Sequence, residues 1–375
     1  MASRKNSFVR SVCLVSFITF AFFFLILEFG VSRIVKVPHL VYRYWGNRPV
    51  TYYPSLSQRA VTENYDISFK SNSWGFKDVE HAIPKMPGTY RVLLLGDSYI
   101  EAAGVLISEQ VSQQMQKIAK EKGHQWEVIS IGMSGYGQAQ QLSYLKQFGK
   151  KIAPDAVVTF FCANDYWNNA YDYQPADFRL DNRNLISQLP QKETPVPLIQ
   201  KVFRATLSQT ESYYIMKHAF ERLRGSLGTS KKEMEVAAFA LGVSAKMKGA
   251  SENKSEKEKM ARLIGSDYEI DLFRALVREI KREAQFENHA LLINTLVSSD
   301  VRKESEDFNW FMHWTENSFK ELGAPVVNFD SEFRRRSRED GVLPHFESDS
   351  HWNATGNRWV AERLVEEILK QNRAR

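Results

Sequence analysis

Ser98 stands where an apolar run, VLLL (92–95), ends in a glycine and an aspartate. A serine hydroxyl is a weak nucleophile until a base takes its proton, and a histidine with a near-neutral pKa is the usual base. Close to the C-terminus the sequence reads DSHW, in which His351 follows Asp349 by two residues. An acid on the second ring nitrogen of a histidine fixes its tautomer and stabilises the imidazolium. These residue types predict nucleophilic chemistry at Ser98.

Each of these motifs alone has a plainer explanation. A serine in a strand-to-helix turn is more often a helix cap, and a histidine after an acidic residue usually lies on the surface. Two further segments, GMSGYGQAQ (132–140) and CANDYWNN (162–169), could be ordinary turns. What favours a site is that all four segments occur in one chain, at the ends of the elements expected there.

The elements that must position these residues alternate along the chain. Short apolar runs predict strands, and amphipathic stretches between them predict helices. The expected strands are 90–95, 126–131, 155–161, 290–297 and 324–330. The expected helices are about 108–122, 138–148, a capped helix from Ser266, one around 310–322 and a final one at about 355–371.

Continuous apolar strands separated by helices are typical of a parallel sheet that is covered on both faces. We therefore expect a three-layer α/β/α fold with a five-stranded parallel sheet, of the flavodoxin-like kind. Ligands of such sheets bind outside the carboxyl ends of the strands. The first three strands end at Ser98, at 132–140 and at 162–169, and the segment 347–357 precedes the last helix, so one site can hold all four segments.

The four segments resemble, in the same order, the signature blocks of the SGNH or GDSL hydrolases. The resemblance implies that Ser98 is the nucleophile and that Asp349 and His351 are the orienting acid and the general base. It also implies an oxyanion hole formed by the backbone N–H groups of Ser98 and Gly135 and by the side-chain amide of Asn164. Such a set of donors stabilises the negative oxygen of a tetrahedral intermediate.

The sequence departs from the family pattern at two positions. Ser348 stands where the family often has its acid, three residues before the histidine, so Asp349 takes that role and Glu347 is the fallback. This D-x-H-W arrangement resembles that of the alginate O-acetylation proteins. Ala163 replaces the glycine that commonly precedes the asparagine of the third block. Asp97 is expected to brace the turn and to take no part in the chemistry.

The N-terminus predicts a membrane anchor. Arg4, Lys5 and Arg10 precede an uncharged run from Ser11 to Leu27, and apolar residues resume up to residue 31. A helix over 11–31 can cross a bilayer, and the basic residues before it are expected to stay in the cytoplasm. A cleaved signal peptide is the competing interpretation, but the apolar run is longer than usual for one.

The domain organisation follows from these elements. Residues 1–34 are expected to form the tail and anchor, and 76–375 the SGNH-like domain. Residues 35–75, which show no helical or strand periodicity, are expected to form a juxtamembrane stalk draped over that domain. A helical insertion at about 170–265 interrupts that domain. Whether the insertion is a lid over the site or a loose excursion stays open at the level of sequence.

Composition excludes several other classes of protein. The 375 residues are 43% hydrophobic and 25% charged, and the net charge of +6 is dispersed, so nucleic-acid binding is not expected. Two cysteines, Cys13 in the apolar run and Cys162, leave no intradomain disulfide. No Walker loop or dinucleotide fingerprint is present and the histidines lack metal-ligand spacing, so we expect neither a cofactor nor a metal.

We therefore expect a serine-dependent ester hydrolase that acts outside the cytoplasmic membrane, on acyl esters such as O-acetyl groups of envelope or exported polysaccharide. Two alternatives stay open. In an O-acyltransferase a sugar hydroxyl replaces water, and a non-catalytic carbohydrate-binding module would keep the fold without turnover. Tyr136, Tyr166 and Trp167 could line a sugar-binding cleft, but aromatic residues near a strand end more often pack in the core.

Overall fold

A five-stranded parallel sheet with the strand order β11-β10-β7-β5-β6 forms the centre of the protein. Its strands are β5 (Tyr90–Gly96), β6 (Trp126–Gly132), β7 (Ala156–Phe161), β10 (Leu291–Leu296) and β11 (Val326–Asn328). The computed structural model describes residues 2–45, 48–170, 178–182, 184–187, 199, 206, 210–226, 264–287, 290–297, 301–302 and 306–374.

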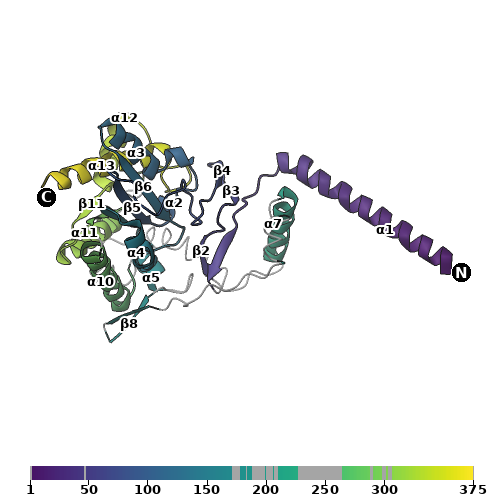
Figure 1. Ribbon diagram of the computed structural model, residues 1–375, viewed down its shortest axis with the longest axis horizontal. Coiled ribbons are helices and arrows are strands. Elements are labelled where there is room, and N and C mark those ends of the chain that lie inside the picture. Colours follow the sequence, from purple (N-terminus) through teal and green to yellow (C-terminus); the bar gives the residue numbers. More distant parts are fainter. Residues whose placement is uncertain are drawn as a thin grey trace.

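Helices cover both faces of this sheet (Figure 1). Side chains of successive strand residues point to opposite faces, so Val92 and Leu94 of β5 pack in one core and Leu93 and Leu95 in another. The first core is closed by α3 (Val111–Glu121), α12 (Asp330–Asp340) and α13 (Ala354–Ala374). The second is closed by α4 (Gln138–Ile152) and α10 (Asp267–Arg282).

A third, largely aromatic core lies where β7 and β10 end. Phe161 of β7 packs against Tyr166 of α5 (Asp165–Ala170) and against Phe273 of α10. Phe311 and Phe319 of α11 (Glu306–Glu321) complete this cluster. The packing fixes the start of α5, which directly follows Asn164.

The three-layer α/β/α fold and all five predicted strands are confirmed, each within two residues at either end. The predicted capped helix from Ser266 is α10, in which Ser266 and Glu269 form the expected capping box. Three short helices were not predicted. They are α2 (Ser98–Glu101), α5, which has six residues, and α12, whose sequence DSEFRRRSRED has a single buried side chain, Phe333.

The segment 35–75 has regular structure, although its sequence shows no helical or strand periodicity. It forms two antiparallel hairpins, β1 (Tyr42–Trp45) with β2 (Arg48–Tyr52) and β3 (Ser57–Val61) with β4 (Asp66–Lys70). The strands are hard to recognise in the sequence because few of their residues are buried. Tyr52 and Phe69 are buried in the second core, where they pack edge to face, so these hairpins are part of the folded body.

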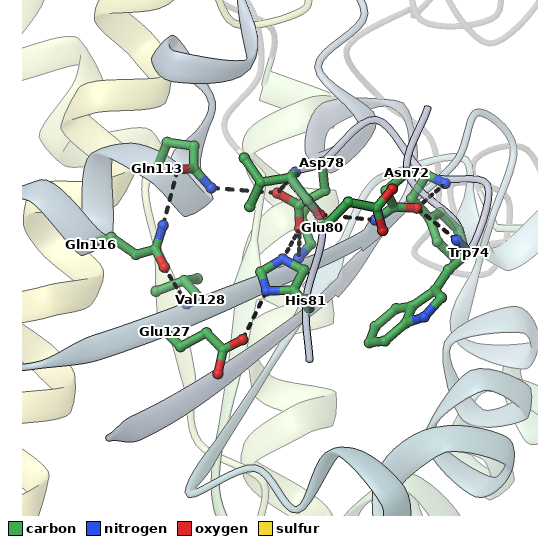
Figure 2. Close-up of polar contacts among 12 residues, drawn as sticks. Asn72, Trp74, Asp78, Glu80, His81, Gln113, Gln116, Glu127 and Val128 are labelled. Atoms are coloured by element: carbon green, nitrogen blue, oxygen red, sulfur yellow. Dashed lines mark hydrogen bonds and ion pairs between the residues drawn. The ribbon is translucent and has the colours of Figure 1, made fainter. Parts of the chain in front are cut away.

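The residues that follow the hairpins protect the free edge of the sheet. β6 is the last strand, and alternate backbone N–H groups along it have no strand partner. Asp78 accepts a hydrogen bond from the N–H of Ser130 at 2.7 Å, and Gln116 of α3 accepts one from the N–H of Val128 at 3.1 Å (Figure 2). Both bonds satisfy donors that a second chain could otherwise pair with.

His81 joins this edge network through both ring nitrogens, as Figure 2 shows. Its Nε2 lies 3.0 Å from Asp78 and its Nδ1 2.9 Å from Glu127, and its side chain is only 2% exposed. Burial opposes the imidazolium, but the hydrogen bonds and charges of the two carboxylates outweigh it and raise the pKa of His81 above 6.5.

The N-terminal helix extends away from the folded body (Figure 1). α1 (Ala2–Leu25) continues through a π-helical turn, η1 (Ile26–Gly30), and a 3₁₀ turn, η2 (Val31–Arg33). Within the 24 residues Arg10–Arg33, an 18-residue window has a mean hydropathy of 2.5, and none of that window is buried against the rest of the chain. This helix is long and apolar enough to span a membrane.

The predicted insertion at 170–265, including the possible lid, lies mostly outside the described residues. Its described parts are a small hairpin, β8 (Phe178–Asp181) with β9 (Asn184–Ser187), and the helix α7 (Glu211–Ser226). The hairpin was not predicted, whereas α7 covers the helix expected around 213–223.

The network at His81 predicts a pH-dependent contribution to stability. A group whose pKa is raised by folding stabilises the protein below its unfolded pKa of about 6.5, and this contribution is lost as the pH rises through the higher folded value. We expect His81→Asn to lower the free energy of unfolding by about 2 kcal/mol just below pH 6.5 and by less in alkaline solution.

Denaturant titration of the full-length protein in detergent at both pH values measures this difference. The exposed His124, replaced in the same way, is the control and should show no such dependence. An equal loss for His81→Asn at both pH values would show that the imidazolium is not the stabilising form.

Candidate active site

Ser98 lies at the carboxyl end of β5, in a turn that only small residues permit. Asp97 caps the short helix α2 (Ser98–Glu101) by accepting a hydrogen bond from the N–H of Tyr99 at 3.0 Å. A Cβ atom on Gly96 would lie 2.5 Å from the side chain of Ile100, and one on Gly132 would lie 2.5 Å from the backbone of α2. The two glycines therefore let α2 rest on the ends of β5 and β6, with Ser98 half-buried at its start.

His351 contacts the hydroxyl of Ser98. The distance from its Nε2 to Ser98 Oγ is 2.7 Å, and that from its Nδ1 to Asp349 Oδ1 is 2.6 Å. The same carboxylate oxygen accepts the backbone N–H of His351 at 3.0 Å, which holds the acid and the ring in one turn. The structure thus brings together the three residues that were expected to form a triad.

Trp352 and Tyr99 fix the position of the loop that carries His351. Trp352 is buried in the first core and packs edge to face on Tyr99, with ring centroids 4.8 Å apart. The Tyr99 hydroxyl donates to the carbonyl of Ser350 at 3.1 Å, and its ring lies 4.8 Å from that of His351. The tryptophan of the D-x-H-W motif is therefore the packing anchor of this loop.

The two residues before Asp349 contact other parts of the chain. Glu347 is exposed, and Arg302 donates a hydrogen bond to its backbone carbonyl. Ser348 accepts a hydrogen bond from the side chain of Asn64, at the tip of the β3–β4 hairpin, at 2.7 Å. Asp349, and not the fallback Glu347, is the acid beside His351.

The electrostatics of this pair favour a charged imidazole. Burial opposes the imidazolium, but the hydrogen bond and the charge of Asp349 outweigh it, so the pKa of His351 is raised above 6.5. Burial likewise disfavours the carboxylate of Asp349, yet the contacts with His351 outweigh it and lower the pKa of Asp349. With a side chain that is 38% exposed, His351 can still exchange protons with solvent.

Gly135 and Asn164 lie on the two loops that flank Ser98. β6 and β7 are the neighbours of β5 in the sheet, and the loops after them carry Gly135, with a φ of +78°, and Asn164. The loops of Gly135 and Asn164 therefore lie on the two sides of Ser98.

Buried amides tie these two loops together. Gln138, the first residue of α4, donates to the carboxyl of Asp165 at 2.5 Å and accepts from the amide of Asn169 at 2.8 Å. Asn169 in turn accepts the N–H of Ala139 at 2.9 Å. Because Asp165 follows Asn164 directly, these bonds fix the distance between the loops of Gly135 and Asn164.

Asp97 and Asp165 place two carboxyl groups in the interior near these loops. Burial raises the pKa of Asp97 to about 6, and burial together with the charge of Asp97 raises the pKa of Asp165 well above its ordinary value. Protonation of Asp165 removes a negative charge that would oppose an oxyanion at this edge of the sheet.

Glu101 is a buried carboxylate that sequence reasoning missed. It lies one turn after Ser98 and accepts hydrogen bonds from the N–H and the hydroxyl of Ser134, at 2.7 and 2.6 Å, and from the hydroxyl of Tyr52. Ser134 immediately precedes Gly135. Glu101 therefore joins the helix of the nucleophile, the loop of Gly135 and the β1–β2 hairpin.

Lys77 holds the turn that follows α2. It is buried and donates to the carbonyls of Ala102, at 2.6 Å, and Val105, where Ala102 ends α2 with a φ of +48°. Burial lowers the pKa of Lys77 to about 7, although the nearby charge of Glu101 works in the opposite direction.

Other candidates from the sequence lie elsewhere. Tyr136 and Tyr166 are fully buried in the second and third cores, which favours the packing alternative for both, and Trp167 packs against the third core. His345 is buried and forms a bridge with Trp352. Among the described residues no cluster of three or more histidine, cysteine or acidic side chains could hold a metal ion.

Comparison with known proteins gives likenesses of fold. No protein-family model matches the sequence, and no curated protein matches it. The acetyl xylan esterase AlAXEase is 14% identical, with 74% of this chain and 99% of that chain covered and a TM-score of 0.41. The lipase/acylhydrolase from Enterococcus faecalis is 14% identical over 75% and 96% of the two chains, with a TM-score of 0.38. The psychrotrophic esterase EstA from Pseudoalteromonas sp. is 13% identical, with 76% of this chain and 99% of that chain covered and a TM-score of 0.38.

The raised pKa of His351 predicts how the reactivity of Ser98 depends on pH. Only the neutral imidazole can take the serine proton, so labelling by a fluorophosphonate should rise with pH through a midpoint above 6.5. Asp349→Asn removes the carboxylate that raises this pKa, and we expect a lower midpoint and a plateau rate lowered by about 10⁴-fold. Labelling rates across pH measure both, and an unchanged midpoint in Asp349→Asn would contradict the assignment.

Glu101 is predicted to act as a positioning residue. Glu101→Ala frees Ser134 and should slow fluorophosphonate labelling of Ser98 by about 10 to 100-fold, because the donor loop shifts. Glu101→Gln keeps an acceptor for Ser134 and should recover much of the rate. Glu121→Ala, at an exposed site on α3, is the matched control. A folded Glu101→Ala variant that labels at the wild-type rate would exclude this role.

Proposed function

We propose that this protein is a serine ester hydrolase of the SGNH type that works through an acyl-Ser98 intermediate. The observation that carries the proposal is the chain of contacts from Ser98 Oγ to His351 Nε2, at 2.7 Å, and from His351 Nδ1 to Asp349, at 2.6 Å. A nucleophile, a base and an orienting acid at these distances are the parts that acyl transfer needs.

The reaction starts when Ser98 Oγ attacks the carbonyl carbon of the ester and His351 Nε2 takes the hydroxyl proton. The carbonyl oxygen becomes negative and accepts hydrogen bonds from the N–H groups of Ser98 and Gly135 and from the amide of Asn164. The intermediate then collapses: the bond to the alcohol oxygen breaks, and His351 returns the proton to the leaving alcohol. Water, deprotonated by His351, releases the acid from Ser98 in a second cycle of the same steps.

The same proposal places this chemistry outside the cytoplasm. The apolar helix Arg10–Arg33 would remain as a single-pass anchor, with Arg4 and Lys5 on the cytoplasmic side and the catalytic domain on the other. Acyl esters available there are those of envelope or exported polysaccharide, and O-acetyl groups are the substrates we infer.

Transfer of the acyl group to a sugar hydroxyl is the second candidate function, and it uses the same acyl-serine. The D-x-H-W motif resembles that of alginate O-acetylation proteins, which favours it. The packing of Trp352 between Tyr99 and the core gives this tryptophan a structural role in either reaction. What decides between the two is which acceptor reaches the acyl-enzyme.

Replacement of Ser98 distinguishes hydrolysis from transfer by whether the acetyl content of surface polysaccharide rises or falls. In cells that carry Ser98→Ala, we expect the acetyl content of surface polysaccharide to rise above that of the wild type, because a deacetylase has been lost. A fall would instead show transfer. The exposed Ser108, replaced by alanine, is the control and should leave the acetyl content unchanged.

Purified full-length protein gives the complementary measurement. Wild type should hydrolyse acetyl and short-chain esters, and Ser98→Ala should lose the activity by about 10⁴-fold or more. Equal rates for the two proteins would contradict catalysis by Ser98 and would leave the non-catalytic carbohydrate-binding module as the surviving alternative.

A further inference from the structure

α7 is hydrogen-bonded to the outer end of the membrane-spanning helix. The carboxylate of Glu28, in η1, accepts the backbone N–H groups of Glu211 and Ser212, at 3.2 and 2.8 Å, and the hydroxyl of Ser212 at 2.8 Å. The first turn of a helix has unsatisfied N–H groups and a partial positive charge, so a carboxylate is a good partner for it. Figure 1 shows α7 beside this end of α1.

The position of Glu28 sets the depth of α7 in the membrane. With a rise of 1.5 Å per residue, Glu28 lies about 10 Å from the middle of the span Arg10–Arg33, whereas half of the hydrocarbon core is about 15 Å thick. Glu28 thus lies about 5 Å inside the boundary between hydrocarbon and headgroups, which is the depth to which interfacial helices bury their apolar face. Any group that donates to its carboxylate must lie at that depth.

The face of α7 that points away from the protein is apolar. Met216 and Phe220 are 47% and 63% exposed, and Ala219 between them is exposed as well. Residues spaced by three and four positions lie on one side of a helix. On another side Tyr214 is buried and stacks on His39, with ring centroids 4.1 Å apart.

An ion pair and a neutral contact hold α7 to the β3–β4 hairpin and to the residues before it. Glu211 lies 3.0 Å from Arg59, which also binds Asp66 at 2.7 Å. Glu211 lies 3.0 Å from His39 as well, whose pKa burial lowers to about 4, so that this ring is neutral. Lys36, just beyond the anchor, binds the same aspartate at 2.6 Å. The anchor, the hairpin and α7 are therefore joined as one unit, and α7 keeps its depth and its orientation.

From this arrangement we infer that α7 is a membrane-interface helix, which inserts Met216 and Phe220 into the outer surface of the bilayer that α1 spans. The occupant of this apolar face is lipid, because Ser212 bonds the first turn of α7 to Phe24 and Glu28 of the membrane-spanning helix, which places the face at the depth that Glu28 fixes. An amphipathic helix with its apolar side at this depth is stable in the interface. With α1 it would give the membrane two attachment points and so fix how the site faces the cell surface.

Spin labelling of the full-length protein in phospholipid nanodiscs tests this inference. Cys13 and Cys162 are replaced by alanine, and a single cysteine is introduced at Phe220, at Phe20 or at Arg358. Phe20, 66% exposed in α1, reports lipid, and Arg358, on the exposed face of α13, reports water. Collisions of each label with oxygen, which is enriched in lipid, and with a water-soluble nickel chelate are measured.

We expect the label at Phe220 to resemble that at Phe20, with high oxygen and low nickel accessibility. Accessibility to nickel as high as at Arg358 would overturn the inference, because α7 would then face water. Low accessibility to both reagents would also overturn it, since the face would be covered by protein, either a second copy or another subunit. If the label at Phe20 itself showed low oxygen and high nickel accessibility, the result would contradict the membrane span on which the inference rests.

A paired substitution provides the second measurement. Met216→Glu with Phe220→Glu places charges at the interface and should raise the nickel accessibility of a label at the neighbouring Ala219 by several fold. Hydrolysis of a soluble ester should stay unchanged, because α7 takes no part in the triad, and this shows that the variant is folded. An unchanged accessibility in an active variant would count against insertion.

Discussion

The hydrogen bond between Ser98 and His351 is the contact on which the proposed chemistry depends. It joins residues 253 positions apart at 2.7 Å, and neither partner can reach the other through local structure. Ser98 is presented by the glycine turn that ends β5, and His351 by a loop that Trp352 anchors in the core before α13 begins. The parallel sheet places Ser98 at the edge where its strands have their carboxyl ends, and the loop between α12 and α13 brings His351 to the same edge.

Around this bond, buried hydrogen bonds between side chains and loops hold the site together, in addition to apolar packing. Glu101 links α2 to the loop of Gly135, and Gln138 links that loop to the start of α5 beside Asn164. Each tie satisfies groups that would be costly to bury alone, and together they restrict the loops to one arrangement. The juxtamembrane hairpins take part through Tyr52, so the segment next to the anchor supports the site directly.

Much of the fold could be predicted from the sequence because its signals are local. Five apolar runs specify the sheet, and Ser266 with Glu269 specifies the start of α10. The meeting of Ser98, Asp349 and His351 was predicted from the resemblance of the four segments to the SGNH blocks, together with the strand ends at which the first three of them lie. Glu101 could not be predicted, since its partners Ser134 and Tyr52 come from distant segments and no periodicity marks them. The hairpins of residues 42–70 escaped prediction for a related reason, because the residues that they bury, such as Tyr52, Ala60 and Phe69, are few and come from strands that lie apart in the sequence.

The central claim is that Ser98 becomes acylated with the help of His351. Peptide mapping by mass spectrometry, after brief reaction of the full-length protein with an activated acetyl ester, tests it most directly. The account predicts a single acetyl adduct on the peptide that carries Ser98, absent from Ser98→Ala and strongly reduced in His351→Ala. An adduct on another residue, or one of equal yield in His351→Ala, would contradict it.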